Sequence, residues 1–454
     1  MTPPSLQQAC RFWLRLGLVS FGGPAGQISL LHSELVEQRR WLSERRYLHA
    51  LNYCMLLPGP EATQLATYIG WLLHGPVGGL LAGGLFLLPS VLILTALATV
   101  YALWGQLPLL AAVFWALKPA VVAVVLHAAW RLGRRTLQHP ALTVIAALAF
   151  LGLTVLQLPF PALIAAAAAA GWLLARRWPQ WFRRPAAISS TPASSNSSSS
   201  SAADSAPAIH DDTTPTPAHG RFSRRRLARM LLLAGLALGL PLAGLSWWGG
   251  WDGPLATMAR FFTRVALLSF GGAYAVLPYV AQGAVGQFNW LTAAAMADGL
   301  ALGETTPGPL IMVVAFVGFM GGWNLFGSWW GAVAATLTVV WFTFLPSFVF
   351  ILAGAPLVEA SREDLRLGAP LTAITAAVVG VIANLAVLLA GPALWPQAGD
   401  FNPAGLGIAV GSLLALLLWR WSVLQVIGAS AGIGLLSWGG GDAGWLIWPA
   451  EQAG

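Results

Sequence analysis

The sequence predicts an all-α polytopic membrane protein with two inverted-topology repeats, each containing broken or re-entrant helical hairpins. Three observations support this class: composition, an internal repeat, and the placement of arginines. Of the 454 residues, 57% are hydrophobic and only 9% are charged, and the mean hydropathy is +0.71. Soluble domains carry about 25% charged residues. Apolar stretches long enough to cross a bilayer, about 17–25 residues, recur along the chain.

The internal repeat has constant spacing over its first fifty residues. "RFWLRLGLVSFGG" begins at Arg11 and "RFFTRVALLSFGG" begins at Arg260, which is 249 positions later. The same offset relates the "PGP" at 58–60 to the "PGP" at 307–309, while "LPS" recurs at 88–90 and 345–347 with an offset of 257. Such self-similarity predicts an internal duplication of the kind that builds transporters.

The arginines predict that the two copies have opposite orientations. Four arginines, Arg39, Arg40, Arg45 and Arg46, flank Trp41, whereas the matching stretch around Trp290 has no basic residue. The same contrast recurs between "WRLGRR" and the neutral "LAGPALWPQAGDFNP" of the second copy. Basic loops stay in the cytoplasm. The two repeats are therefore expected to be inverted relative to each other.

The predicted topology treats the segments with central Gly and Pro as re-entrant hairpins. These segments are 6–36, 47–74, 255–285 and 292–322. Membrane spans are expected near 77–104, 108–131, 141–157, 160–177, 226–248, 327–354, 370–391, 403–419 and 421–437. The span near 226–248 has no counterpart, and it allows the second repeat to enter the membrane with the opposite orientation.

Four regions follow from this topology. Residues 1–182 form an N-terminal membrane repeat, 183–221 a disordered Ser/Pro-rich cytoplasmic linker, 222–250 an extra transmembrane helix, and 251–454 a C-terminal membrane repeat. The linker prediction rests on its Ser, Ala, Pro and Thr content, which cannot bury a core.

Several classes of protein are disfavoured. The net charge of +8 comes from basic residues in loops between apolar spans, which does not indicate a nucleic-acid partner. Two cysteines without a CxxC or Cys/His cluster predict neither a disulfide framework nor a metal site. The N-terminus lacks a cleavable signal peptide, and no P-loop motif is present. We expect a multi-pass protein of the plasma (inner) membrane without a cofactor, and not an enzyme.

The helix breaks are the predicted binding site. Free N–H groups at the start of a helix bind anions, and irregular backbone inside a membrane is tolerated beside a cavity. Ser20, Gly22 and Gly23 form this edge in the first copy, and Ser269, Gly271 and Gly272 form it in the second. The alternative is that these glycines only permit close packing of helices.

Acidic and neutral polar residues lie beside the PGP turns. Glu61 follows the first turn and Glu304 precedes the second. For these carboxylates there are two alternatives: they take part in proton coupling, or they cap the N–H groups that the helix break leaves free. Gln64 and Thr306 offer neutral hydrogen bonds next to the same turns, and Asp298 is a further acid at membrane depth.

Basic residues offer a second set of candidates. Arg15 and Arg264, each following Arg11 or Arg260 by four positions, either hold a dianion or anchor the chain at the interface. Lys118 is the only lysine and lies inside a span, so it is a ligand candidate unless it pairs with Glu61 or Glu304.

The motifs "SFGGPAGQI", "VEQRRWLSERRY" and "LLPGPEATQLATYIGW", with the second copies "SFGGAYAVLPYV" and "ETTPGP", resemble the chromate ion transporter family. The resemblance covers both halves outside the linker and the C-terminal tail. It implies a long-chain, two-domain member that exports chromate, with sulfate as a competing tetrahedral dianion. The motif positions carry over to Ser20, Phe21, Gly22, Gly23, Pro24, Gln27, Arg39, Arg40, Trp41, Pro58, Gly59, Pro60, Gln64 and Gly70.

The second copy departs from the motif, since Pro24 is matched by Ala273 and Glu61–Gln64 by Leu310–Val313. One dominant site is therefore expected, mostly from the first half and completed by the second. The predicted substrate-binding residues are Ser20, Phe21, Gly22, Gly23, Pro58, Gly59, Pro60, Gln64, Ser269, Gly271, Gly272, Thr306, Gly308, Arg15, Arg264 and Lys118.

The expected function is export of chromate across the membrane, which would confer chromate resistance. A sulfate or molybdate transporter, an anion channel and an enzyme acting on a lipid-linked substrate are the alternatives. The expected partners are chromate as substrate and the lipid bilayer. Whether the chain also forms a homodimer stays open.

Overall fold

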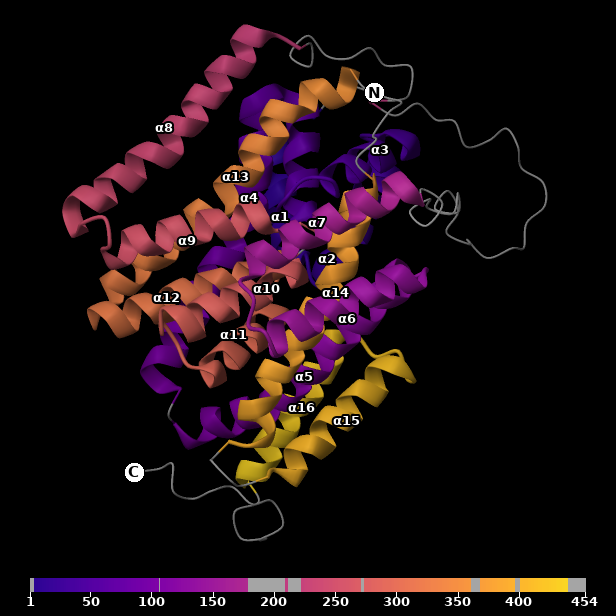
Figure 1. Cartoon of the computed structure of the whole chain (residues 1–454). Coiled ribbons are helices and arrows are strands. Elements are labelled where there is room, and N and C mark those ends of the chain that lie inside the picture. The colour runs from indigo at the N-terminus through magenta and orange to yellow at the C-terminus, as the bar shows by residue number, and fades with distance from the viewer. Residues whose placement is uncertain are drawn as a thin grey trace.

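The computed structural model describes residues 4–105, 107–178, 209–210, 222–270, 273–360, 368–396 and 401–439. Within these ranges the chain forms helices and one isolated β-bridge, between Leu42 and His210. Five helices are long and apolar enough to cross a membrane: Glu61–Trp104, Pro108–Thr136, Arg224–Gly249, Trp329–Pro356 and Pro370–Leu394. The predicted all-α polytopic class is confirmed (Figure 1).

Among the described residues of the first repeat there are seven α-helices and one π-helical turn. In chain order these are α1 (Leu6–Val19), α2 (Gly23–His32), η1 (Ser33–Gln38), α3 (Glu44–Cys54), α4 (Glu61–Trp104), α5 (Pro108–Thr136), α6 (Pro140–Thr154) and α7 (Phe160–Arg177).

The second repeat reproduces this order after one additional helix, α8 (Arg224–Gly249). It consists of α9 (Pro254–Leu268), α10 (Ala273–Ala281), the π-helical turn η4 (Gln282–Gln287), α11 (Ala293–Thr305), the 3₁₀ turn η5 (Leu310–Met312), α12 (Val313–Phe326), α13 (Trp329–Ala360), α14 (Gly368–Leu394), α15 (Pro403–Leu417) and α16 (Val423–Gly439).

Local sequence signals set these boundaries. A capping box begins α1, in which Ser5 Oγ accepts from Gln8 N and Ser5 N donates to Gln8 Oε1. Proline lies in the first turn of α2, α5, α6, α7 and α9, where its missing N–H costs no helical hydrogen bond. Phe12, Trp13 and Leu16 recur at helical spacing and bury one face of α1.

The duplication extends to unusual backbone details. The π-helical turn at 33–38 recurs at 282–287, which is the predicted offset of 249. Arg40 and Asn289, at matching positions, both have positive φ, 53° and 51°. The next residues also match, since Trp41 N and Trp290 N each donate to a backbone oxygen six residues earlier at 2.7 Å. The predicted internal repeat is therefore confirmed.

The packing of α4 against α13 shows that the two repeats are inverted. These helices carry the corresponding "LPS" motifs and lie side by side (Figure 1). Gly79 lies against Leu352, Gly83 against Phe348, and Trp329 Nε1 donates to Thr99 Oγ1 at 3.1 Å. The residue numbers on α13 decrease as those on α4 increase, so the two helices run antiparallel. Corresponding helices that run antiparallel are related by an axis perpendicular to them, as inverted topology requires.

The first segment of each repeat is a re-entrant hairpin, as predicted. After the break at Ser20 the chain turns back, so that Trp41 packs on Phe12 with ring centroids 4.7 Å apart. In the second repeat the matching pair, Trp290 and Phe261, packs edge-to-face in the same way, with centroids 5.6 Å apart. The chain thus returns to the side from which it entered.

The second segment of each repeat also returns to its starting side. His74 Nε2, at the end of the first arm of α4, lies 2.8 Å from the oxygen of Pro4, which precedes α1. Asn324 Nδ2 of α12 donates to Trp290 O at 2.9 Å. Non-helical torsion angles at His74 and Gly75 bend α4 there, and its second arm crosses the membrane. The predicted boundary between 47–74 and 77–104 is confirmed.

The last helices of each repeat are exchanged. Helices α6 and α7 pack on α14 of the second repeat, and α15 and α16 pack on α5 of the first. The extra helix α8 packs on α9 and α13 only at its edge, and none of its residues is buried. Of the predicted disordered linker, only Ile209 and His210 lie within the described residues, and both bond to the backbone of Arg40–Ser43.

Candidate functional site at the crossing of the helix breaks

Each PGP turn binds the broken helix of the opposite repeat. Gly59 N donates to Ser269 O at 2.8 Å, and Gly308 N donates to Ser20 O at 2.7 Å. These two reciprocal bonds join the four breaks in two pairs, and each pair connects the two repeats. We call the residues of these two pairs the crossing, defined by Ser20, Pro58–Pro60, Ser269 and Pro307–Pro309.

Glycine is required at the centre of each PGP turn. Gly59 has φ 132° and Gly308 has φ 110°, torsion angles that other residues rarely adopt. A Cβ at Gly59 would collide with Ser347 Oγ, and a Cβ at Gly308 would collide with Ser90 Oγ. Ser90 and Ser347 are the serines of the two "LPS" motifs. Sequence reasoning found this motif as a repeat but did not assign the serines to the site.

The break before α2 presents a helix start to the crossing. Helix α1 ends at Val19, Gly22 has φ 90°, and α2 begins at Gly23 with Pro24 in its first turn. The Phe21 side chain is 38% exposed. The matching Gly271 and Gly272 lie outside the described residues, so their predicted role is not placed.

Side-chain amides satisfy the turn carbonyls. Gln27 Nε2 donates to Gly308 O and lies 3.4 Å from Ser20 O. Gln64 Nε2 donates to Pro58 O at 2.7 Å, and Ser90 Oγ donates to Pro307 O at 2.5 Å. Gln27 and Gln64 are thus both brought to the crossing.

Five buried polar atoms on residues in and around the crossing have no hydrogen-bond partner within the described part of the chain. They are Ser20 Oγ, Thr63 Oγ1, Gln64 Oε1, Ser269 Oγ and Ser347 Oγ. A buried polar atom without a partner costs free energy, about 1–3 kcal/mol each. Native structures rarely keep several such atoms together. Their concentration indicates a place where a polar ligand supplies the missing bonds.

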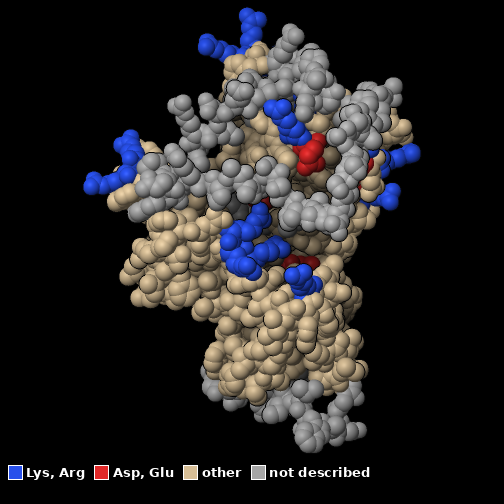
Figure 2. Space-filling model, turned by 90° about the vertical axis from the view of Figure 1, so that its right-hand side faces the viewer, with Lys and Arg blue, Asp and Glu red and all other residues tan. Residues whose placement is uncertain are grey.

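The two predicted carboxylates lie near the arginine-bearing end of α5. Glu304 accepts a hydrogen bond from Tyr274 Oη at 2.6 Å, and the charge of Arg131 acts on both groups. Glu61 begins α4, and the charge of Arg135 acts on it. Figure 2 shows basic and acidic side chains gathered in a recess near the middle of one face, above a lower part drawn mostly in tan.

The predicted basic ligands lie elsewhere. Arg15 is exposed on α1 and lines a surface pocket with Arg11 and Arg39, and Arg264 is exposed on α9. Lys118 Nζ lies 3.6 Å from Asp298 Oδ2, so its partner is Asp298 and not Glu61 or Glu304.

Thr306 and His127 also have local partners. Thr306 is buried, and its hydroxyl donates to Gly303 O at 3.2 Å. His127 is half-buried and stacks on Trp130 with centroids 5.9 Å apart. Neither side chain depends on a ligand for its contacts.

A family model described as "Chromate transporter" matches residues 7–172 and 256–437, which together make up most of both repeats. The chain belongs to the chromate transporter family. Both matched ranges contain a half of the crossing.

The relatives include proteins with this activity in their names. A chromate transport protein of Pseudomonas aeruginosa is 31% identical over 99% of this chain and 94% of its own length. A chromate transport protein of Cupriavidus metallidurans is 27% identical over 96% and 94%. The uncharacterized transporter YwrA of Bacillus subtilis is 30% identical over 26% of this chain and 65% of its own length. No solved structure matches.

The remaining motif residues of this chromate transporter family member make contacts within the two hairpins of the first repeat. The Arg39 guanidinium lies over the Phe12 ring at 4.6 Å and over Trp41 at 5.7 Å. Arg40 takes the positive φ that ends the π-helical turn. Gly70 lies against Gly78, where the two arms of α4 approach closely. Of the motif, Ser20 and Pro58–Pro60 belong to the crossing itself, and Gln27 and Gln64 donate hydrogen bonds to its turn carbonyls.

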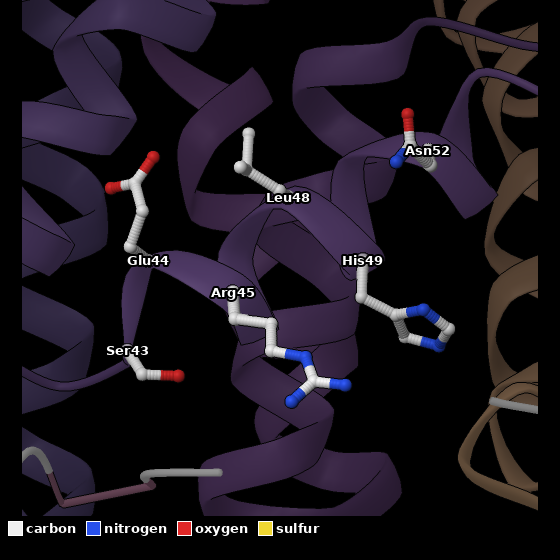
Figure 3. A pocket seen from close by; sticks show the side chains of 6 residues that line it. All are labelled: Ser43, Glu44, Arg45, Leu48, His49 and Asn52. Carbon is white, nitrogen blue, oxygen red and sulfur yellow. The ribbon is translucent and has the colours of Figure 1, made fainter. Parts of the chain in front are cut away.

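A pocket away from the crossing was not predicted. It has a volume of about 530 Å³ and is lined by Ser43, Glu44, Arg45, Leu48, His49 and Asn52 of α3 and its cap (Figure 3). His49 Nε2 is buried and has no hydrogen-bond partner among the described residues. His49 lies 249 positions before Asp298, and this offset is the signal by which the sequence identifies it.

Proposed function

We propose that this chain exports chromate across the cytoplasmic (inner) membrane and thereby confers chromate resistance. The crossing is the proposed substrate site. The observation that carries the proposal is the group of buried, unpartnered polar atoms in and around the two hydrogen-bonded pairs of helix breaks, in a member of the chromate transporter family.

The chemistry of the crossing suits a tetrahedral oxyanion. The hydroxyls of Ser20, Ser269 and Ser347 each have a free proton to donate. The start of α2 adds backbone N–H groups and a partial positive charge. Gln64 Oε1 only accepts, so it orients a neighbouring hydroxyl or binds a protonated oxyanion. Neutral donors hold an anion without the strong binding that would prevent its release.

The membrane potential favours export of such a substrate. An interior-negative potential is worth about 2.3 kcal/mol per charge per 100 mV, and therefore about 4.6 kcal/mol for a dianion. Export thus needs no coupled proton. We propose alternating access, in which the re-entrant hairpins move relative to the central α5–α14 pair.

The test is uptake of labelled chromate into inverted membrane vesicles or proteoliposomes, with potential and proton gradient imposed separately. We expect saturable uptake that an interior-positive potential drives in inverted vesicles, and we expect unlabelled sulfate and molybdate to compete less well than chromate. Protein-free liposomes are the control. Absence of protein-dependent chromate flux under every gradient would exclude the proposal. Uptake that does not saturate would favour a channel.

A further inference from the structure

The two repeats do not pack in the same way on the central helices. In the second repeat, α10 packs on α14, and α11 packs on both α5 and α14. The corresponding helices of the first repeat, α2 and α3, make no comparable packing on α5 or α14 within the described residues. An exact two-fold relation would require both sets of contacts.

The hydrophobic cores show the same asymmetry. The hairpins of the second repeat belong to the large core cluster that includes α5 and α14. The hairpins of the first repeat form a separate cluster, which reaches the second repeat only through Ile351, Leu352 and Ala355 of α13. One pair of hairpins is therefore docked on the central helices and the other is not.

An ion pair links the docked hairpin to α5. Asp298 of α11 is 2% exposed, and its Oδ2 lies 3.6 Å from Lys118 Nζ. Tyr101 Oη of α4 donates to the same oxygen at 2.9 Å. The Asp298 carboxylate is the buried member of the pair, so breaking the pair is costly because it leaves a buried charge without its partner.

The internal repeat identifies the two residues that correspond to Asp298 and Lys118. Asp298 corresponds to His49 by the offset of 249. Lys118 corresponds to Thr375 by the offset of 257, which also aligns "KPAVVAVV" at 118–125 with "TAAVVGVI" at 375–382. His49 on α3 and Thr375 on α14 are therefore the repeat-related counterparts of Asp298 on α11 and Lys118 on α5.

The two pairs belong to opposite ends of the central helices. A Cβ at Gly133 of α5 would lie 3.4 Å from Val379 of α14, four residues after Thr375. In the antiparallel α5–α14 pair of an inverted repeat, Thr375 is then level with the end of α5 near Thr136. Eighteen residues of helix separate Thr136 from Lys118, which is about 27 Å at 1.5 Å per residue.

The Thr375 end is also the arginine-bearing end. Arg131, Arg134 and Arg135 lie in the last turns of α5, and Arg45 lies on α3 beside His49. The positive-inside rule assigns this end to the cytoplasm. The undocked hairpin and its pocket therefore face the cytoplasm, and the Lys118–Asp298 pair lies toward the external side. Figure 3 shows the His49 ring projecting from α3.

We infer that Asp298, Lys118 and Tyr101 form the closed external gate, and that His49 moves onto Thr375 to form the cytoplasmic gate in the alternate state. This inference rests on the proposed transport function. The structure is then the cytoplasm-open state, in which substrate from the cytoplasm reaches the crossing. The external gate closes through an ion pair, whereas the cytoplasmic gate is built from a histidine and a threonine.

Crosslinking tests the two gates without relying on transport. Lysine is long, so a short bis-methanethiosulfonate crosslinker suits these positions better than a direct disulfide. In a chain with Cys10→Ser and Cys54→Ala, one variant carries Asp298→Cys and Lys118→Cys, and a second carries His49→Cys and Thr375→Cys. The control variant carries His49→Cys and Lys118→Cys, which lie at opposite ends in both states.

We expect the first pair to crosslink in the resting protein and the second pair to crosslink in only a fraction of it. Adding chromate should change that fraction at least twofold, and the control pair should not react. Each completed crosslink should abolish chromate uptake. Crosslinking of 49 with 375 that stays at the control level under all conditions overturns the inference.

The outcomes separate this inference from the proposed function. If both pairs crosslink in a mutually exclusive way but no chromate flux is found, the gates are correct and the substrate assignment fails. If chromate flux is found while 49 and 375 never crosslink, the function is retained and the cytoplasmic gate is wrong.

Discussion

The two PGP turns have the same backbone but different hydrogen bonding. At the PGP turn of the second repeat, two side chains of the first repeat are the donors: Ser90 donates to the oxygen of Pro307, and Gln27 donates to the oxygen of Gly308. In the first repeat, Gln64 donates to Pro58 O instead. The serine that corresponds to Ser90 is Ser347, and it is left buried without a partner.

Under the proposed function, this difference separates the duplicated turn into a structural copy and a binding copy. Position 64 holds glutamine in the first repeat, and its counterpart 313 holds valine. The glutamine takes the carbonyl that the serine would otherwise occupy, so the serine hydroxyl is released for a ligand. One dominant site in the first half, as expected from the sequence, remains a prediction that this geometry supports.

The largest effect should come from removing the glycine of the binding turn. Gly59→Val forces a branched residue to φ 132° and drives its side chain into Ser347 and Gln64. Backbone strain of this kind costs about 1–3 kcal/mol before the clash is counted. We expect chromate uptake to fall by about 100-fold or more. The measurement is initial uptake rate per reconstituted molecule.

Gly84→Val is the matched control. Gly84 lies on α4, the helix that follows the binding turn, and a Cβ added to it would have no neighbour within 4 Å. It should insert, fold and transport normally. Equal loss in both variants would show that valine damages α4 in general, and would leave the turn without a special role.

The sequence predicted much of the fold because its signals are local. Gly and Pro mark each helix break, and the constant offset of 249 transfers every break to the second repeat. The inverted orientation followed from arginine placement. These predictions needed no knowledge of contacts between distant residues.

The unpredicted features all depend on contacts between the repeats. Ser90 reaches Pro307 across 217 positions, and Lys118 reaches Asp298 from another helix. The docking of only one hairpin pair was also not predictable, because both states of an inverted repeat satisfy the same sequence. No local sequence pattern indicates which of the two hairpin pairs is docked on the central helices.

A smaller effect should follow from giving the binding turn the residue of the structural turn. Gln64→Val removes the donor to Pro58 O, and Ser347 can then turn to that oxygen as Ser90 does in the second repeat. The turn stays bonded while the site loses two polar groups. We expect the apparent KM for chromate to rise about 10–100-fold, with a small change in the midpoint of thermal unfolding.

The double variant Gln64→Val with Ser347→Ala checks that explanation. If Ser347 compensates, the double variant loses clearly more thermal stability than the two single changes combined, because Pro58 O then has no donor. Additive losses would mean that Ser347 does not replace the glutamine.

The smallest expected effect distinguishes the two corresponding serines by what they change. Ser347→Ala removes a hydroxyl without a protein partner, so it should raise the apparent KM for chromate about tenfold and should keep or raise the unfolding midpoint of the ligand-free protein. Ser90→Ala removes the donor to Pro307 O, and it should cost about 1–3 kcal/mol of stability with little change in KM. Uptake kinetics and thermal unfolding of both variants give the comparison. If the two serines affect KM equally, the turns are equivalent in binding and the hydrogen-bond asymmetry carries no specificity.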